Sequence, residues 1–244
     1  MKNKPDYGID APGVLQGLFI GGVACLLVAL FVLPFKIGSV LILPSGFYWP
    51  AGFLLAECVL WMLYAKYGKH KHRDFMLDMH AWRGDEHVLD VGCGRGLLLA
   101  GAAKRIAACG GSGNASGIDV WSNTDMGSNS AAATTRNLEL EGIERLCTLV
   151  SRPAQEMPFA DASFDLVVSN LCLHNIYNRA ARHRALEQIA RVLKPGGVAI
   201  LSDYKRTGEY ARTLRDFGLA VEKRHGSWLT TFPPLAVVLA RKPA

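Results

Sequence analysis

Paired cysteines are missing from this 244-residue sequence, and their absence limits the kinds of site that it can build. The six cysteines stand far apart and form no Cys-X-X-Cys pair. The pattern therefore predicts neither a structural zinc site nor a disulfide framework. We expect reduced thiols and no bound metal.

Charge is also scarce, at 20% of the residues, whereas 50% are hydrophobic. Lys and Arg exceed Asp and Glu by 27 to 21, but the basic residues form one clear cluster, between Lys66 and Arg73. A nucleic-acid partner is not expected, because binding it would need a larger basic surface. The apolar excess indicates that part of the chain faces lipid, and the length leaves room for one full-sized domain and a short appendage.

Two long apolar segments near the N-terminus predict a membrane hairpin. Residues 14–33 carry no charge and are long enough to cross a hydrocarbon core of about 30 Å. Asp10 and Pro12 precede them, so we expect the Asp10 carboxylate to cap the first helix. A second helix is expected over about 47–65, interrupted only by Glu57 and flanked by aromatic residues at both ends. Residues 34–46 are too short to span and should form the turn on the lipid side.

The basic residues indicate how this hairpin is oriented. Lys2 and Lys4 precede the first apolar segment, the Lys66–Arg73 cluster follows the second, and the turn holds only Lys36. The positive-inside rule then places both termini in the cytosol. The alternative is a cleaved signal peptide followed by a buried core helix. We expect a membrane hairpin and basic linker over 1–75, and a second domain over 76–244.

The second domain alternates short apolar strands with helices, as in a parallel sheet covered on both faces. The strand His87–Val91 leads into Gly92, Gly94 and Gly96, so the backbone there can approach a ligand closely. The spacing is Gly-X-Gly-X-Gly, not the Gly-X-Gly-X-X-Gly of dinucleotide-binding folds, and Asp90 stands two residues ahead. An acidic strand end suits an ammonium better than a pyrophosphate.

The next strand ends in two candidate ligand contacts. Asp119 could accept hydrogen bonds from both hydroxyls of a ribose, and Trp121 offers a ring face for an adenine. Further strands are expected at 146–151, 164–170 and 197–204, with a helix over 178–193 before the last of these.

Four segments in order, VLDVGCGRG, GIDVW, EMPFADASFDLVVSN and RVLKPGGVAILSD, resemble the motifs of class I S-adenosylmethionine-dependent methyltransferases. The chain looks most like the type 11 branch, which includes the ubiquinone and menaquinone methyltransferases. The resemblance covers roughly residues 76–242 and leaves out the hairpin. It implies S-adenosylmethionine as cofactor and a Rossmann-like seven-stranded sheet of order 3-2-1-4-5-7-6 with helices on both faces.

The resemblance also implies roles for single residues. Asp90, Gly92, Gly94 and Gly96 resemble the loop that holds the methionine part, and Asp119 resembles the acid that holds the ribose. Asn170, at the end of the 164–170 strand, would lie beside the methionine part. Relatives usually carry an Asp for the adenine amino group where this chain has Pro153. Trp121 stacking and the Ala154 backbone would then hold the adenine.

His174 follows the 164–170 strand, where a parallel sheet opens its ligand crevice. It could take a proton from the acceptor, or it could only pack the loop. We expect a membrane enzyme that methylates a small molecule, lipophilic if it arrives through the bilayer. The rival is a membrane module that binds S-adenosylmethionine without turnover. The sequence leaves open the oligomeric state and the choice among O-, N-, C- and S-methylation.

Overall fold

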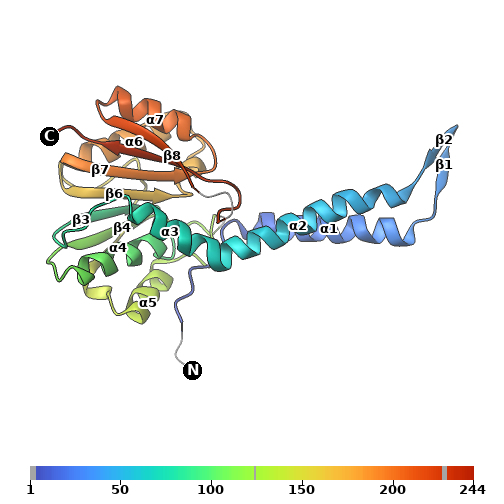
Figure 1. The fold of residues 1–244 in the computed structure, drawn as a ribbon, viewed down its shortest axis with the longest axis horizontal. Helices are drawn as coiled ribbons and strands as arrows, with labels where there is room; N and C mark the ends of the chain where they lie inside the picture. The colour runs from blue at the N-terminus through green and yellow to red at the C-terminus, as the bar shows by residue number, and fades with distance from the viewer. Residues whose placement is uncertain (1–3, 124, 227–229) are drawn as a thin grey trace.

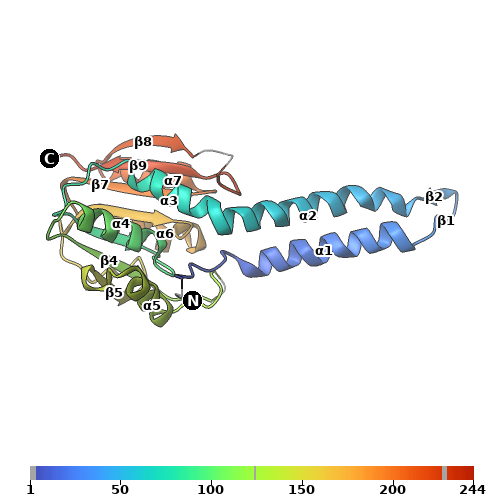
Figure 2. The ribbon, with the colours of Figure 1, turned by 60° about the horizontal axis from the view of Figure 1, so that its bottom comes forward.

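The computed structural model describes residues 4–123, 125–226 and 230–244. A globular domain carries a long helical hairpin that points away from it (Figures 1 and 2). Lys2, which entered the prediction of topology, lies outside the described residues.

The hairpin consists of α1 (Pro12–Phe31) and α2 (Tyr48–Leu63), which lie side by side in both views. Gly22 of α1 faces Leu55 of α2 so closely that a Cβ atom there would lie 2.8 Å from the leucine Cγ. At the tip, the segment predicted as a turn forms two short antiparallel strands, β1 (Phe35–Ile37) and β2 (Val40–Ile42). The 3₁₀ turn η1 (Pro44–Phe47) then leads into α2.

The predicted cap of the first helix is wrong. The residue before α1 is Ala11, in a left-handed conformation, and no side chain caps the helix. Asp10 instead pairs through its backbone with Met126, and its carbonyl accepts a hydrogen bond of 3.0 Å from Trp61 Nε1. Asp10 lines a cavity of the globular domain and does not cap the helix.

The second helix does not end near residue 65. It continues through a π-helical segment, η2 (Tyr64–Gly68), into α3 (Lys69–Leu77), so that one helix of 34 residues runs from Pro44 to Leu77. The residues expected as a linker are therefore helical. They pack on α4 (Leu97–Ala108), where Gly101 leaves room for the side chains of Arg73 and Leu77.

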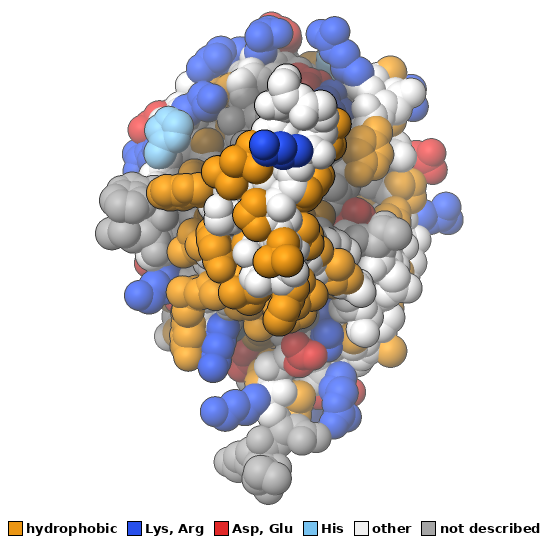
Figure 3. Space-filling model, turned by 90° about the vertical axis from the view of Figure 1, so that its right-hand side faces the viewer, with side chains coloured by type: hydrophobic (Ala, Val, Ile, Leu, Met, Phe, Trp, Pro, Cys, Tyr) orange, Lys and Arg blue, Asp and Glu red, His pale blue; other side chains and the backbone are white. Residues whose placement is uncertain are grey.

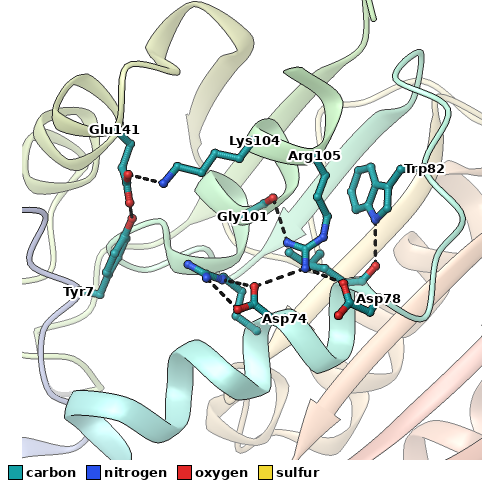
Figure 4. A network of polar contacts seen from close by, with 10 residues as sticks. Tyr7, Asp74, Asp78, Trp82, Gly101, Lys104, Arg105 and Glu141 are labelled. Atoms are coloured by element: carbon teal, nitrogen blue, oxygen red, sulfur yellow. Dashed lines mark hydrogen bonds and ion pairs between the residues drawn. The ribbon is translucent and has the colours of Figure 1, made fainter. Parts of the chain in front are cut away.

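Polar contacts also join α3 to the globular domain (Figure 4). Arg105 of α4 lies 2.7 Å from the Asp78 carboxylate and 3.3 Å from that of Asp74. Trp82 donates through Nε1 to the Leu77 carbonyl, at 2.9 Å. The hairpin is thus continuous with the globular domain.

A mixed sheet of seven strands forms the centre of that domain in the described part of the chain. Its order is β5-β4-β3-β6-β7-β9-β8, in which β9 runs antiparallel to both neighbours. Numbered within this sheet alone, the order reads 3-2-1-4-5-7-6, as the resemblance implies. The strands are β3 (His87–Val91), β4 (Asn114–Asp119), β5 (Cys147–Ser151), β6 (Phe164–Asn170), β7 (Leu193–Asp203), β8 (Ala220–His225) and β9 (Ala236–Arg241).

Helices cover both faces of the sheet. The described helices and 3₁₀ turns after α4 are α5 (Ala131–Glu141), η3 (Glu144–Leu146), η4 (Leu173–Asn175), α6 (Arg179–Val192) and α7 (Thr207–Asp216). Leu186 of α6 and Leu214 of α7 belong to one buried cluster, whereas Met76 of α3 and Ile106 of α4 belong to a second. Because strands β3, β4, β5, β6 and β7 are parallel, their carboxyl ends meet at one edge of the sheet.

The residues before α1 lie on this domain, a contact that the sequence analysis missed. Tyr7 is buried, and its hydroxyl donates to Glu141 at 2.6 Å (Figure 4). Asp6 forms an ion pair of 3.0 Å with Arg95, and the Lys69 ammonium donates to the Tyr7 carbonyl at 2.8 Å. We call residues 4–11 the N-terminal segment.

Candidate cofactor and active site

A cavity of about 290 Å³ opens at the carboxyl ends of β3, β4 and β6. It lies where a doubly wound sheet reverses its strand order, the usual place for a ligand in such folds. Five of the nine site residues suggested by the sequence line it, namely Gly92, Gly94, Asp119, Ala154 and Asn170.

The glycine loop lets the backbone form the wall of this cavity. Gly92 has a φ of +73°, and a Cβ atom on it would lie 2.1 Å from the Cys172 sulfur. A side chain is therefore excluded both by backbone conformation and by space. Gly96 has a φ of +86° and directly precedes α4, but it packs against Thr134 and does not line the cavity.

Asp119 stands at the end of β4 and organises the loops around it. One carboxylate oxygen accepts from the Gly94 amide at 2.7 Å, and the other accepts from the Trp121 amide at 2.6 Å. The Asn129 amide also donates to this second oxygen, at 3.5 Å. A carboxylate has about four acceptor positions, so one remains for a ribose hydroxyl, and a second hydroxyl would replace the long bond from Asn129. This geometry suits the role expected for Asp119.

Of the two residues expected to hold the adenine, Ala154 lines the cavity and Trp121 does not. The indole of Trp121 donates through Nε1 to the Ser151 hydroxyl at 2.7 Å, and the ring is not part of the cavity wall. Pro153 and Ala154 do line the cavity. Adenine stacking on Trp121 would need this indole to leave Ser151, whereas the Ala154 backbone is already in place.

Asp90 is buried at the end of β3, and only half of its carboxyl is satisfied. One oxygen accepts from the Leu99 amide at 2.9 Å, and Oδ1 has no hydrogen-bond partner. Burial raises the pKa of Asp90 to about 8; the negative charge of Asp119 adds to this rise and the Leu99 hydrogen bond opposes it. Asp90 lines a second cavity, of about 50 Å³, which shares Gly92 and Asn170 with the first.

Two buried oxygen atoms without hydrogen-bond partners make these two cavities a suitable site for S-adenosylmethionine. The unsatisfied oxygens Asp90 Oδ1 and Asn170 Oδ1 both belong to residues that line the smaller cavity. Buried acceptors without partners are uncommon in proteins, and the ammonium of the cofactor would supply the missing donors.

His174 lies in η4 and is held by Asp203, at the end of β7. Its Nδ1 atom is 2.9 Å from an Asp203 carboxylate oxygen, and its ring meets that of Tyr204 edge to face at 4.8 Å between centroids. Asp203 also accepts from the Tyr210 hydroxyl at 3.0 Å. His174 itself does not line the cavity, whereas Cys172 and Asn175 on either side of it do.

Sequence reasoning missed several cavity residues that come from distant parts of the chain. Asp10 lines both cavities, and Tyr64, Lys69 and Arg95 line the smaller one. Lys69 entered the sequence analysis only as a topology signal. Nothing in the local pattern of a basic helix end marks one lysine as buried against the globular domain. All six cysteines are free, and the described residues hold no group of three or more His, Cys, Asp or Glu that could bind a metal.

The sheet order, the glycine loop and the acid at the end of β4 together define the class I S-adenosylmethionine-dependent methyltransferase fold. Residues 89–201 match the family model described as a methyltransferase domain of the type 11 group. Residues 89–201 thus form a methyltransferase domain, and S-adenosylmethionine is the cofactor of that domain.

Comparisons with known proteins agree with this class. The chain is similar to demethylmenaquinone methyltransferase of Symbiobacterium thermophilum, at 32% identity over 66% of this chain and 56% of that protein. It is also similar to the ubiquinone/menaquinone biosynthesis C-methyltransferase of Chromobacterium violaceum, at 30% identity over 59% of this chain and 54% of that protein. The chain therefore spans about half the length of these curated relatives.

Solved structures share the fold at low identity. A methyltransferase from Methanosarcina mazei gives a TM-score of 0.54 at 17% identity, covering 69% of this chain and 97% of the other. The cyclase SpnF gives a TM-score of 0.59 at 18% identity, covering 72% of this chain and 81% of the other. At such identities the likeness concerns the fold, and the second example shows that the fold alone does not set the reaction.

Proposed function

We propose that this chain is a membrane-anchored methyltransferase that moves a methyl group from S-adenosylmethionine to a small lipophilic acceptor. The observation that carries the proposal is the continuous helix from the apolar hairpin to the wall of the cofactor cavity. An acceptor dissolved in the bilayer would meet the enzyme along this helix.

The apolar surface of the hairpin supports the membrane part. Only 6% of the most apolar window of α1 is buried, and the same holds for the helix Pro44–Leu77. A core helix of a soluble domain would be mostly buried, whereas here apolar side chains cover the outer surface (Figure 3). Lipid is the medium that lets such a surface remain exposed.

The contacts at the base of the hairpin support an uncleaved anchor. A cleaved signal peptide would remove Tyr7 and its hydrogen bond to Glu141, together with the packing of α1 on α2. The N-terminal segment and α3 both contact the globular domain, so both ends of the hairpin lie on its side. With the basic cluster beside α3, we propose that this side is the cytosol.

The names of the relatives suggest the acceptor class. Two are methyltransferases of quinone biosynthesis, and a third, from Caenorhabditis elegans, is described as a sterol 4-C-methyltransferase at 33% identity over 53% of this chain and 34% of that protein. Quinones and sterols both reside in membranes. We propose an acceptor of similar lipophilicity, with its reactive ring or headgroup near the membrane surface.

The chain's own residues would act mainly by alignment. When bound, S-adenosylmethionine supplies an electrophilic methyl group on a sulfonium. The glycine loop and Asp119 would fix the nucleoside, and the acceptor would approach in line from the side of Cys172 and Asn175. If His174 Nδ1 donates to Asp203, Nε2 is left as the basic nitrogen, which could take a proton from a hydroxyl acceptor.

The test is methyl transfer by the full chain in lipid nanodiscs. Labelled S-adenosylmethionine is offered with quinols, phenols, amines and thiols, each with and without an apolar tail. We expect a labelled product from tailed acceptors and much less from their water-soluble counterparts, with Asp119→Ala as the inactive control. Binding of S-adenosylhomocysteine without transfer to any acceptor would favour the non-catalytic module instead.

A further inference from the structure

Buried polar atoms without partners gather at one place in this protein. Among the described residues, five buried side-chain nitrogen or oxygen atoms have no hydrogen-bond partner. Four of them belong to residues that line the smaller cavity, namely Tyr64, Asp90, Arg95 and Asn170. The Tyr64 hydroxyl lies near the Asn170 amide, but no hydrogen bond of normal geometry joins them. Such a cluster costs stability unless a ligand completes it.

The cluster contains both kinds of hydrogen-bonding group. Asp90 Oδ1 and Asn170 Oδ1 are acceptors, whereas Arg95 Nε is a donor and the Tyr64 hydroxyl can donate. The Lys69 ammonium in the same cavity wall donates to the Tyr7 and Gly8 carbonyls, which leaves it a third N–H for a ligand. A ligand that satisfies all of them must carry a donor cation and an acceptor anion close together. The ammonium and carboxylate on one carbon of an α-amino acid meet this requirement.

The π-helical segment explains how two residues of the hairpin helix reach this cavity. The Lys69 amide donates to the carbonyl of Tyr64, five residues earlier. This bond places the two side chains on the same side of the helix, whereas in an α-helix residues five apart point about 140° away from each other. Gly68 allows the close approach of Thr230, whose carbonyl oxygen would lie 2.2 Å from a Cβ atom there.

Burial outweighs the electrostatic compensation that the chain gives to the ionisable groups of this cavity. Burial lowers the pKa of Lys69, which the carboxylates of Asp10 and Asp6 partly offset, and burial raises the pKa of Asp90. Arg95 has one ion pair, to Asp6 at 3.0 Å. An ammonium beside Asp90 and a carboxylate beside Lys69 would compensate both groups.

The resemblance already implies that Asp90 and Asn170 lie at the ammonium end of the cofactor. We propose that the helix leaving the hairpin completes this site, with Tyr64 and Lys69 beside Arg95 at the cofactor carboxylate. This inference rests on the cofactor and not on methyl transfer. It makes the helix that leaves the hairpin part of the cofactor site, so cofactor binding requires that helix in place.

The experiment compares two ligands on the full chain in detergent. S-adenosylhomocysteine carries the amino-acid end, and methylthioadenosine has the same nucleoside and a thioether without it. We expect Tyr64→Phe to weaken binding of S-adenosylhomocysteine about 10-fold or more in calorimetry and to leave methylthioadenosine unchanged. The melting temperature without ligand should not fall, because the lost hydroxyl has no partner.

Two further variants make the test specific. Tyr67→Phe changes a 55% exposed side chain of the same π-helical segment, outside the smaller cavity, and should alter neither affinity. Lys69→Met should weaken S-adenosylhomocysteine selectively, and Lys69→Arg should restore part of the loss. Equal losses for both ligands, or no loss for S-adenosylhomocysteine in Tyr64→Phe and Lys69→Met, would overturn the proposal. If the parent chain binds S-adenosylhomocysteine with this pattern but methylates no acceptor, the subsite stands and the proposed function fails.

Discussion

The carboxyl group of Asp90 makes the stability of the fold depend on pH. Its pKa of about 8 lies well above the ordinary value of 3.8, chiefly because of burial. A raised pKa in the folded state favours folding at low pH, and this contribution is lost as the pH rises from about 4 toward 8. A bound ammonium reverses the preference, since it favours the carboxylate.

We therefore expect cofactor binding to release a proton from Asp90. The affinity for S-adenosylhomocysteine should rise between about pH 5.5 and 7.5, below the range where an α-amino group titrates. Asp90→Asn should bind more weakly and show a flatter pH profile. Calorimetry in buffers of different ionisation enthalpy measures the released proton directly. An unchanged pH slope in Asp90→Asn would assign the titration to another acid of the cavity, such as Asp10.

His174 is the second residue whose role a variant can decide. Asp203 holds Nδ1 at 2.9 Å, an arrangement that orients a base but also one that fixes a loop. If His174 is a base, His174→Ala should lower turnover by about 10²-fold or more, with S-adenosylhomocysteine binding nearly intact. Melting temperature and turnover are measured for His174→Ala and His174→Gln. Normal turnover in both folded variants would leave alignment as the whole of the catalysis.

At the scale of elements, the hairpin depends on close contact between α1 and α2. A Cβ atom on Gly22 would lie 2.8 Å from Leu55 Cγ, whereas Gly17 in the same helix has nothing within 4 Å. Gly22→Ile should separate the helices and destabilise the hairpin by about 1–3 kcal/mol, and Gly17→Ile should be close to neutral. Cysteine crosslinking between the two helices, in membranes, reports their separation. Similar crosslinking in both variants would show that the contact at Gly22 is not needed.

Element boundaries show where sequence patterns stop being informative. The helix predicted over 178–193 matches α6, because the Asn178 side chain caps it by accepting a hydrogen bond of 3.0 Å from the Ala181 amide. The second hairpin helix, in contrast, continues to Leu77, well beyond the predicted end near 65. The sequence there changes from apolar to basic, which suggests a linker. Packing of α3 on α4 keeps these residues helical.

At the scale of the whole molecule, the exposed apolar hairpin leads to a prediction about where the protein resides. If the proposed membrane anchor is right, the full chain should remain in the membrane pellet after alkaline carbonate extraction, because lipid would cover the exposed apolar surface of α1 and α2. A C-terminal reporter should give a cytosolic signal. Release by carbonate, or a reporter signal from the opposite side, would contradict the hairpin or its orientation.

The sequence by itself determined the fold class and most of the strands. Apolar strands that alternate with amphipathic helices specify a parallel sheet, and the glycine loop after β3 marks the ligand edge. The acid at the end of β4 could also be recognised, because a strand end followed by a loop defines where Asp119 must stand. These features depend on residues close together in the chain.

Only the tertiary structure decided which distant residues complete the cofactor cavities. By sequence pattern, Tyr64 ends the predicted membrane helix, Lys69 lies in the basic linker and Asp10 is a helix cap, yet all three line the smaller cavity. Their placement depends on one π-helical segment, on the docking of α3 and on the path of the N-terminal segment. Each of these is a contact between segments far apart in sequence, so its energy is absent from any local pattern of residues.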